Sequence, residues 1–457
     1  MRIRNTVLKT IPGLSSPTLT VWLTIILASL GSPLAVHAQP QEHWVGTWAT
    51  GLQAQIQPDL ASVDQTTDPS GNLFGPTVQI HNQTLRQIVR TSIGGSSVRV
   101  AFTNTFGTHP LEIGAAHIAL KTDGPSIRPA TTGALTFGGR SSTSIAAGSI
   151  VLSDAVDLEI PELGYLAIDM YLPADTWATQ SPATGLRAAW TTNYLSAPGN
   201  HSGKNDMPIE TTLQSWIFLA RVEVTAPAAT SVVVTLGDSI TEGYGSTTDT
   251  DRRWPDVLAS RLRDEFGNTA PAVLNVAISG NRLLRGNDGA FGVISANSSG
   301  PINPNAGFGP SALDRFDRDV LLQPGITHVV VLESINDIGM TTDPSSPTVD
   351  ELIAGHRALI QRAHSYGLTI YGGTLTPFEG ALYFTEEGET KRQAVNRWIR
   401  SSGAYDAVID FDAVVRDSSN PRRFLPMYHP GDWLHPNDEG YRAMGEAIDL
   451  TLFAATP

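Results

Sequence analysis

The stretch VVVTLGDSIT, residues 232–241, decides the fold of the second half of the chain. Its first five residues form an unbroken apolar run, which is typical of a strand buried on both faces of a parallel sheet. The run passes directly into Gly237, Asp238 and Ser239. Ligands of open α/β sheets bind outside the carboxyl ends of the strands, so Ser239 lies where a nucleophile would be.

Further apolar runs follow at residues 271–277, 327–332, 368–371 and 408–411. They are continuous rather than alternating, so each predicts a strand that is covered on both faces. Helical patterns lie between them, and alternating strands and helices indicate a doubly wound α/β domain. We expect this domain to extend over residues 231–455.

Two helices of this domain stand out in the sequence. The clearest covers residues 348–366, where Thr348 and Glu351 match a capping box. The last helix is predicted over residues 437–453, because four apolar side chains recur there on one stripe, namely Tyr441, Met444, Ile448 and Leu452.

Residues 42–226 have a different pattern, with short β-rich runs between turn residues. In residues 84–104, two runs with partial alternation flank the Gly94-Gly95-Ser96 tripeptide and predict a hairpin. Short strands at such spacing indicate an all-β sandwich or jelly roll, and we find no convincing helix among them. A linker of small residues, 226–231, joins this region to the α/β domain.

The N-terminus has the pattern of a secretory signal peptide. Basic residues precede an apolar run at residues 19–30, which is too short to span a bilayer comfortably. Small residues around Val36-His37-Ala38 then predict cleavage after Ala38. We therefore expect residues 1–38 to be removed and the protein to be secreted or periplasmic. The alternative is an uncleaved anchor helix.

Composition excludes several classes of chemistry and partner. The net charge of -14 repels phosphate backbones and anionic lipid, so nucleic acid and membrane surfaces are not expected partners. Solubility alone is a sufficient reason for this charge. The chain has no cysteine, which excludes disulfides, thiolate metal sites, a cysteine nucleophile and a lipoprotein anchor.

A serine nucleophile needs a base, and the sequence offers one late in the chain. Asp432 and His435 lie three residues apart, just before the predicted last helix, so their side chains can point the same way. The carboxylate can then orient the imidazole and stabilise its protonated form. The alternatives are a structural Asp–His hydrogen bond, or a metal site that includes His429.

Acyl transfer also needs hydrogen-bond donors for an oxyanion. Residues 275–281 follow the second predicted strand and offer the Gly280 N–H, and residues 334–337 follow the third and offer the Asn336 amide. With the Ser239 N–H they would form a hole of three donors. Taken alone, each stretch is more often an ordinary turn after a strand.

The four stretches together resemble the motifs of the SGNH hydrolases, which are also called GDSL esterases and lipases. GDSIT at 237–241 resembles their nucleophile block, SGN at 279–281 their glycine block, SIND at 334–337 their asparagine block and DWLHPN at 432–437 their Asp-x-x-His block. The motifs cover roughly residues 232–453. The resemblance implies an SGNH-type, flavodoxin-like α/β/α domain in three layers behind the β-sandwich.

The resemblance also implies a role for each matching residue. Ser239 would be the nucleophile, and Ser239, Gly280 and Asn336 would form the oxyanion hole. His435 would be the base, oriented by Asp432, and no metal or organic cofactor would be required.

One position departs from the family pattern. The asparagine block is usually Gly-x-Asn-Asp, and Ser334 holds the glycine position. If that position needs a positive φ or close backbone approach, serine strains it and places Asn336 in doubt. The chain has no Gly-x-Ser-x-Gly, which argues against an ordinary α/β-hydrolase elbow.

The leading hypothesis is a secreted serine esterase that hydrolyses carboxylic esters through an acyl-enzyme. A β-sandwich ahead of an SGNH domain resembles some carbohydrate acetyl esterases, so the substrate would be a polysaccharide or small-molecule ester. One alternative is a broad-specificity short-chain carboxylesterase or lipase. Another is a catalytically weak polysaccharide-binding protein.

Aromatic residues outside the motifs carry two open interpretations. Four tryptophans of the β region could stack on sugars, although tryptophans in a sandwich more often belong to the core: Trp44, Trp48, Trp190 and Trp216. Phe291 and Phe308 lie in a long loop, residues 286–309, and could line an acyl or sugar pocket or simply anchor the loop.

Overall fold

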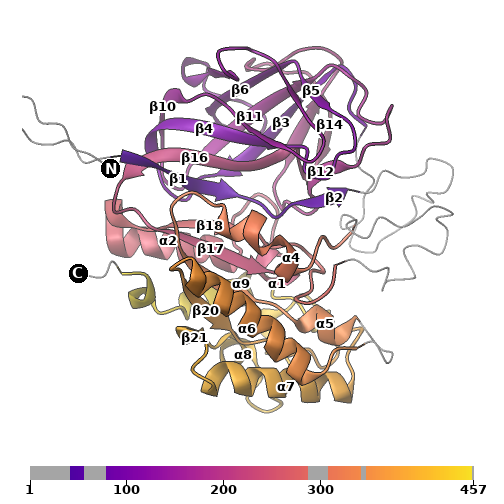
Figure 1. Cartoon of the computed structure of the whole chain (residues 1–457), viewed down its shortest axis with the longest axis vertical. Helices are drawn as coiled ribbons and strands as arrows, with labels where there is room; N and C mark the ends of the chain where they lie inside the picture. The colour runs from indigo at the N-terminus through magenta and orange to yellow at the C-terminus, as the bar shows by residue number, and fades with distance from the viewer. Residues whose placement is uncertain (1–41, 56–78, 287–306, 341–345, 455–457) are drawn as a thin grey trace, which may run out of the picture. The chain divides into compact units, whose positions relative to one another are not determined.

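An antiparallel β region precedes a parallel α/β region along the chain (Figure 1). This computed structural model describes residues 42–55, 79–286, 307–340 and 346–454. The predicted signal peptide, residues 1–38, lies outside the described residues, as does Phe291. The helices within the described ranges include no candidate for a membrane span, since none has the length and apolar character that crossing requires.

Two antiparallel sheets form most of the β region, as predicted for a sandwich. The first has the order β1-β16-β4-β10, with β9 beside β4, and consists of β1 Glu42–Ala49, β4 Gly95–Thr103, β9 Ile150–Leu152, β10 Val156–Ile160 and β16 Leu219–Pro227. The second has the order β14-β13-β3-β11-β6-β7 and consists of β3 Gln83–Arg90, β6 Ala115–Leu120, β7 Gly133–Leu135, β11 Tyr165–Leu172, β13 Asn193–Ser196 and β14 Ile209–Leu213. Phe102 of β4 and Ile168 of β11 belong to the same buried hydrophobic core.

Smaller elements complete the β region. A three-stranded sheet contains β2 Gln53–Gln55, β12 Ala183–Leu186 and β15 Trp216–Ile217. A two-stranded sheet pairs β5 Leu111–Ile113 with β8 Thr143–Ile145. The only helical turn that the structure describes before residue 228 is a 3-10 turn, Pro129–Thr131.

The predicted hairpin in residues 84–104 is wrong. Its two runs are strands β3 and β4, but they belong to different sheets, and the chain crosses between the sheets in residues 91–94. The Thr91 N–H donates to Gly164 O at 2.8 Å and the Ser92 N–H donates to Thr47 O at 3.0 Å. The polar groups that a hairpin turn would have paired internally are thus satisfied by neighbouring strands.

The second region contains a parallel sheet in the order β18-β17-β19-β20-β21. Its strands are β17 Val232–Gly237, β18 Ala272–Asn275, β19 Ile326–Leu332, β20 Thr369–Gly373 and β21 Ala407–Ile409, close to the predicted runs. In chain order this is 2-1-3-4-5, the flavodoxin-like doubly wound order. Strand order reverses between β17 and β19, so the ends of these strands form the expected ligand position.

Helices pack against this sheet in two groups. One group contains α2 Trp254–Phe266, α8 Phe411–Val415 and α9 Asp438–Glu446, and the other contains α4 Ala312–Phe316, α5 Ile335–Gly339, α6 Val349–Ser365 and α7 Glu386–Ser401. Short turns accompany them: α1 Ser239–Glu242, 3-10 turns Gly267–Thr269, Pro426–Tyr428 and Leu450–Phe453, and a π turn Asp317–Leu321. The predicted α/β fold class is confirmed.

The two helices singled out in the sequence have different outcomes. Helix α6 starts at the predicted capping box, in which Thr348 and Glu351 bond each other's backbone N–H groups. The predicted last helix is too long, because α9 ends at Glu446 and a separate 3-10 turn follows. Asp449 has an extended backbone there, and its carboxylate accepts from the Thr451 N–H at 2.9 Å. Such local bonding competes with helix continuation.

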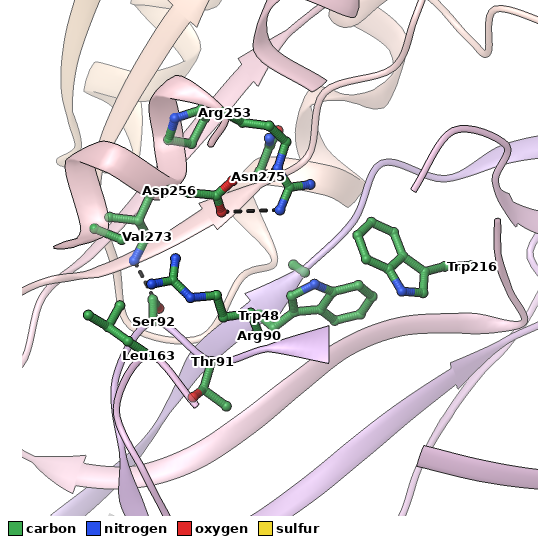
Figure 2. Close-up of a pocket in the computed structure, with 13 residues that line it drawn as sticks. Trp48, Arg90, Thr91, Ser92, Leu163, Trp216, Arg253, Asp256, Val273 and Asn275 are labelled. Atoms are coloured by element: carbon green, nitrogen blue, oxygen red, sulfur yellow. Dashed lines mark hydrogen bonds and ion pairs between the residues drawn. The ribbon is translucent and has the colours of Figure 1, made fainter. Parts of the chain in front are cut away.

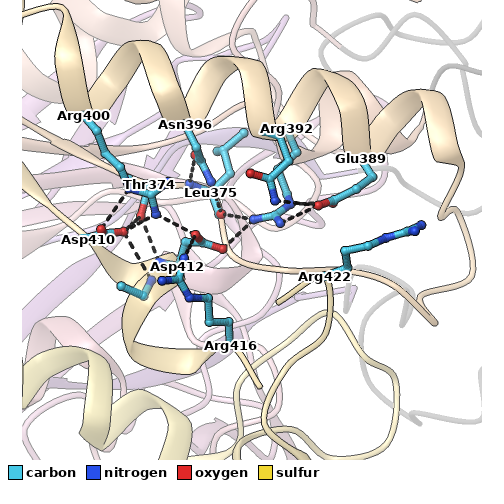
Figure 3. Close-up of polar contacts among 12 residues, drawn as sticks. Thr374, Leu375, Glu389, Arg392, Asn396, Arg400, Asp410, Asp412, Arg416 and Arg422 are labelled. Atoms are coloured by element: carbon cyan, nitrogen blue, oxygen red, sulfur yellow. Dashed lines mark hydrogen bonds and ion pairs between the residues drawn. The ribbon is translucent and has the colours of Figure 1, made fainter. Parts of the chain in front are cut away.

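A buried ion-pair network holds the far end of this sheet together (Figure 3). Arg392 of α7 is fully buried and donates to Asp412 of α8 at 2.7 Å and to Leu375 O, in the loop after β20, at 2.9 Å. Arg400, two turns along α7, donates to Asp410 at 2.5 Å and Asp412 at 2.6 Å. These bonds join α7 to α8 and to the loop after β20, and they stabilise the β21 end of the sheet.

The β region contacts the first edge of the parallel sheet. The Val273 N–H of β18 donates to Ser92 Oγ at 3.1 Å, and the Gly46 N–H of β1 donates to Pro324 O at 3.0 Å. Figure 2 shows a pocket at this contact, between Trp48 and Trp216 of the β region and the start of α2. Its volume of about 30 Å³ accommodates roughly one water molecule. None of the predicted site residues lines it.

Candidate active site

Ser239 stands at the turn between β17 and α1. The Asp238 carboxylate caps this turn by accepting from the Ile240 N–H at 2.9 Å. A Cβ on Gly237 would come within 2.3 Å of the Thr241 hydroxyl and 2.8 Å of Leu332 O, so only glycine lets Thr241 and β19 approach so closely. The Ser239 side chain is thereby fixed at the carboxyl end of the sheet, with 7% of the residue exposed.

The structure brings Ser239 together with the two residues predicted as its partners. Ser239 Oγ lies 2.8 Å from His435 Nε2, and His435 Nδ1 lies 2.6 Å from Asp432 Oδ2. The other oxygen of Asp432 accepts from the Leu434 N–H at 3.0 Å and the His435 N–H at 3.1 Å. The carboxylate is thus held by its own turn while it orients the imidazole.

The turn between Asp432 and His435 depends on an unusual backbone conformation. Trp433 has a φ of 60°, a left-handed value that is strained for a bulky residue. Its indole packs on the His429 ring, with centroids 4.1 Å apart, which holds it in place. Strain of this kind gathers at functional sites because the surroundings impose it.

Bonding to His435 also sets the charge of Asp432. Partial burial would raise the pKa of the Asp432 carboxyl, but the hydrogen bond and the charge of His435 outweigh burial and lower it. Asp432 is therefore ionised throughout the neutral range and can stabilise a protonated imidazole.

Gly280 has the backbone conformation that only glycine adopts easily. Its φ is 75°, and a Cβ there would lie 2.0 Å from the Phe308 ring. Among the described residues, the Gly280 N–H has no hydrogen-bond acceptor, so it is available to an oxyanion. Phe308 thus lies against the glycine block, which is compatible with both interpretations from the sequence, a pocket wall and an anchor of the loop.

Asn336 lies in α5, directly after β19, and is 2% exposed. Its Nδ2 donates to Asn281 O at 3.0 Å, and its Oδ1 accepts from the Tyr383 hydroxyl at 3.2 Å. These two bonds fix the orientation of the amide. The Nδ2 group carries two hydrogens, so one remains for a substrate oxygen.

Ser334 does have the strained conformation anticipated for a serine in the glycine position. Its φ is 104°, in the left-handed region, and it is fully buried. Its hydroxyl lies 3.1 Å from His356 Nε2, and His356 Nδ1 lies 2.7 Å from the Tyr405 hydroxyl. Burial lowers the pKa of His356 to about 4, so this imidazole is neutral. The hydrogen bonds from Ser334 through His356 to Tyr405 compensate the backbone strain at Ser334.

We predict a definite order of stability for substitutions of Ser334. Ser334→Ala keeps the strained φ and leaves His356 without its partner, which should cost about 1–3 kcal/mol of unfolding free energy. Ser334→Gly loses the same bond but relieves about 1 kcal/mol of backbone strain. Denaturant unfolding should therefore rank the wild type first, Ser334→Gly second and Ser334→Ala last. An alanine variant more stable than the glycine variant would contradict strain at this position.

Arg315 of α4 is a positioning residue that the sequence did not reveal. Its side chain is fully buried, and its Nε donates to Asn281 Oδ1 at 2.9 Å. Its Nη2 donates to Gly237 O at 3.1 Å and lies 3.7 Å from Glu333. One guanidinium thus connects the nucleophile, glycine and asparagine blocks. Most of its neighbours are charged, as on a solvated helix, so no sequence signal marks it.

Buried carboxyls surround the nucleophile turn. Burial raises the pKa of Asp238 to about 7 and that of Glu242 to about 7. Glu242 accepts from both the Ser279 N–H, at 2.9 Å, and the Ser279 hydroxyl, which joins the turn to the glycine block. Asp337 accepts from the Leu283 N–H at 2.7 Å, and burial raises its pKa to about 6. Glu242 and Asp337 thus connect neighbouring stretches of the site, whereas Asp238 caps the nucleophile turn itself.

Metal binding was the alternative interpretation of the histidines. Within the part of the chain that the structure describes, no group of three or more His, Asp or Glu side chains could hold a metal ion. Burial lowers the pKa of His429, and its ring packs on Trp433.

The β region contacts the segment next to Phe308 at this site. Gln53 Nε2 and Arg187 Nη2 both donate to Gly307 O, at 2.7 Å and 2.6 Å, next to Phe308. The four tryptophans singled out in the sequence differ in their surroundings. Trp48 and Trp216 are core residues in edge contact, with centroids 4.9 Å apart. Trp44 packs on the Arg99 guanidinium, 4.2 Å from its ring centroid, and Trp190 lies beside the site.

Known proteins were compared with the whole chain. Residues 235–443 match the model of the GDSL-like Lipase/Acylhydrolase family. All four motifs of this chain lie within the matched residues. No curated protein sequence matches the chain.

Similar solved structures cover about half of the chain. A lipolytic protein of the G-D-S-L family from Desulfitobacterium hafniense DCB-2 is 20% identical over 48% of this chain and 97% of its own, with a TM-score of 0.34. A GDSL-like lipase from Bacteroides thetaiotaomicron is 19% identical over 50% and 89%, with a TM-score of 0.34. An acetyl xylan esterase is 17% identical over 47% and 97%, also with a TM-score of 0.34.

The family match covers the end of β17 and the other four strands of the parallel sheet, the nucleophile turn and the Asp432–His435 pair. The C-terminal half of the chain is therefore a GDSL-like lipase/acylhydrolase domain of the SGNH type, a serine hydrolase, preceded by an all-β region.

Proposed function

We propose that the protein is a secreted or periplasmic serine esterase that removes short acyl groups, chiefly acetyl, from carbohydrates through an acyl-enzyme on Ser239. The observation that carries this proposal is the hydrogen-bonded chain from Ser239 Oγ through His435 to Asp432. GDSL acylhydrolases act on esters. The hydrogen-bonded Ser239, His435 and Asp432 provide the nucleophile and the base that attack on an ester requires.

Acylation begins when Ser239 Oγ attacks the carbonyl carbon of the ester. The hydroxyl proton passes to His435 Nε2, 2.8 Å away, while the carbonyl electron pair moves onto oxygen. Asp432 keeps the Nδ1 proton in place and balances the imidazolium charge. Collapse of the tetrahedral intermediate breaks the bond to the alcohol oxygen, which takes the proton from His435.

Deacylation repeats the sequence with water. His435 removes a proton from water as the water oxygen attacks the acyl carbon, and the imidazolium returns the proton to Ser239 Oγ as the acid leaves. In both halves the oxyanion would be stabilised by the N–H groups of Ser239 and Gly280 and by Asn336 Nδ2. Each such donor contributes about 10²–10³ in rate.

Preference for a short acyl group is supported by the surroundings of Gly280. The Phe308 ring packs directly on its α-carbon, and Gly307 is held by Gln53 and Arg187 of the β region. A bulky wall beside an oxyanion donor limits the room for the acyl chain. The predicted signal peptide would deliver this activity to polysaccharides outside the cytoplasm.

Rapid-mixing kinetics with 4-nitrophenyl acetate test the acyl-enzyme. We expect a burst of 4-nitrophenol. After acid quenching, intact-mass analysis should show one added acetyl group, and peptide mapping should place it on the peptide that contains Ser239. Acetate release from acetylated polysaccharides, beside 4-nitrophenyl esters of increasing chain length, tests the substrate class. A burst without an acetylated Ser239 contradicts the mechanism, and equal rates on long and short chains contradict the acyl preference.

A further inference from the structure

The base His435 lies against an aromatic pair, one member of which comes from the β region. The Tyr244 ring packs on the imidazole with centroids 4.1 Å apart and planes tilted by 47°. The Trp190 indole meets Tyr244 edge-on, with centroids 5.5 Å apart and planes at 90°. Both aromatic side chains are partly exposed. Tyr244 and Trp190 are called the aromatic wall below.

Backbone bonds fix the aromatic wall relative to the nucleophile. The Tyr244 N–H donates to Ser239 O at 2.9 Å, and Tyr244 O accepts from the buried Tyr441 hydroxyl at 2.7 Å. Trp190 has a left-handed φ of 52°, and its carbonyl accepts from the Asp249 N–H at 3.1 Å. The loop after the nucleophile and the β region therefore hold each other at this point.

A second pair of bonds strengthens the same connection. The Asp249 carboxylate accepts from the Thr192 N–H at 2.7 Å and from the Thr192 hydroxyl at 2.6 Å. Asp249 belongs to the loop after the nucleophile, and Thr192 lies two residues beyond Trp190 in the β region. The indole is thus set beside the active site by three hydrogen bonds of Asp249 as well as by packing.

The chemistry of ester cleavage decides which part of a substrate meets the aromatic wall. His435 Nε2 must give its proton to the oxygen of the leaving alcohol, so that alcohol lies on the imidazole side. The oxyanion donors Gly280 and Asn336 mark the carbonyl oxygen instead. Residues packed on His435 are therefore next to the alcohol, whereas Phe308, packed on Gly280, is next to the carbonyl.

We propose that the aromatic wall binds the alcohol part of the substrate and selects for a pyranose ring. This inference rests on the proposed esterase function and adds the residues that recognise the sugar. The flat, apolar faces of indole and phenol rings suit the C–H faces of a sugar ring. A small aliphatic alcohol covers little of these rings and gains little from them.

Two acetate esters that differ only in the alcohol test the proposal, namely an acetylated methyl xyloside and ethyl acetate. The ratio of kcat/KM for the xyloside to kcat/KM for ethyl acetate should fall about tenfold in Trp190→Ala, with the loss mainly in KM. Trp44→Ala is the matched control, because this indole belongs to the same region but packs on Arg99, 4.2 Å from its ring centroid. Its ratio should equal that of the wild type.

Binding measured without turnover supplies a second readout. In a Ser239→Ala background, calorimetric titration with the acetylated methyl xyloside should give a Kd about tenfold higher when Trp190→Ala is added. Ser239-dependent turnover of both esters, with a ratio and Kd unaffected by Trp190→Ala, overturns the aromatic wall and leaves the esterase function standing. Absence of Ser239-dependent turnover on either ester overturns both.

Discussion

Ser239→Ala is expected to lower kcat for 4-nitrophenyl acetate by about 10⁶-fold, because it removes the atom that forms the acyl-enzyme. His435 and Asp432 would remain in place but would have no proton to accept. The residual rate would come from the oxyanion donors and from substrate binding, which alone give about 10³–10⁴ over water. Stopped-flow and long-incubation assays cover this range together.

Controls separate loss of the nucleophile from loss of the fold. Ser401→Ala changes another serine, whose hydroxyl donates to Arg397 O of its own helix at 2.7 Å, and should retain wild-type kcat. The melting temperature of Ser239→Ala should stay close to that of the wild type. Full activity in excess EDTA is expected for triad chemistry. Equal rates in wild type and Ser239→Ala would contradict the esterase mechanism.

Asp432→Asn should have the second largest effect, a loss of about 10⁴-fold in kcat. The asparagine oxygen can keep the bonds from the Leu434 and His435 N–H groups, so its NH₂ group would face His435 Nδ1. A donor at that position favours the imidazole tautomer with its proton on Nε2, which cannot accept the proton of Ser239. The fold is preserved and the base is disabled.

The pH-rate profile provides the readout specific to Asp432. Loss of the carboxylate also removes the charge that stabilises the imidazolium, so the acid limb of the remaining activity should move to lower pH than in the wild type. Asp449→Asn, an exposed helix cap that bonds Thr451, is the control and should retain the wild-type profile. A decrease of less than tenfold in Asp432→Asn would contradict its orienting role.

Local patterns were sufficient to predict the elements that are built locally. The continuous apolar runs became the parallel strands, because burial on both faces favours consecutive apolar residues over an alternating pattern. The hairpin failed because Gly94-Gly95-Ser96 permits a turn but also permits a crossover, and pairing to β11 and β16 decided between them. The last helix was overextended because an apolar stripe continues through Asp449, whose local bonding ends the helix.

The candidate site likewise has parts that local sequence predicts and parts that only tertiary contacts reveal. The four motifs could be read from the sequence because each occupies consecutive residues at a strand end or before a helix. Their supports could not, because Arg315, His356 and Trp190 are far along the chain from the blocks that they contact. Strain at Ser334 was anticipated, because serine stands where the family motif has glycine. The hydrogen bond to His356 that compensates this strain could be seen only in the structure.

The contact between Ser92 and Val273 has a consequence for anyone who wishes to express the α/β region alone. Strand β18 is the edge of the parallel sheet, and the β region caps its outward N–H through Ser92 while Gly46 packs against Leu274. Excising residues 42–226 would leave this edge bare and apolar. Bare edges recruit strands from other molecules, so such a fragment should aggregate unless charged residues are engineered into β18. On this reasoning, the β region shields the exposed edge of the parallel sheet from association with other molecules.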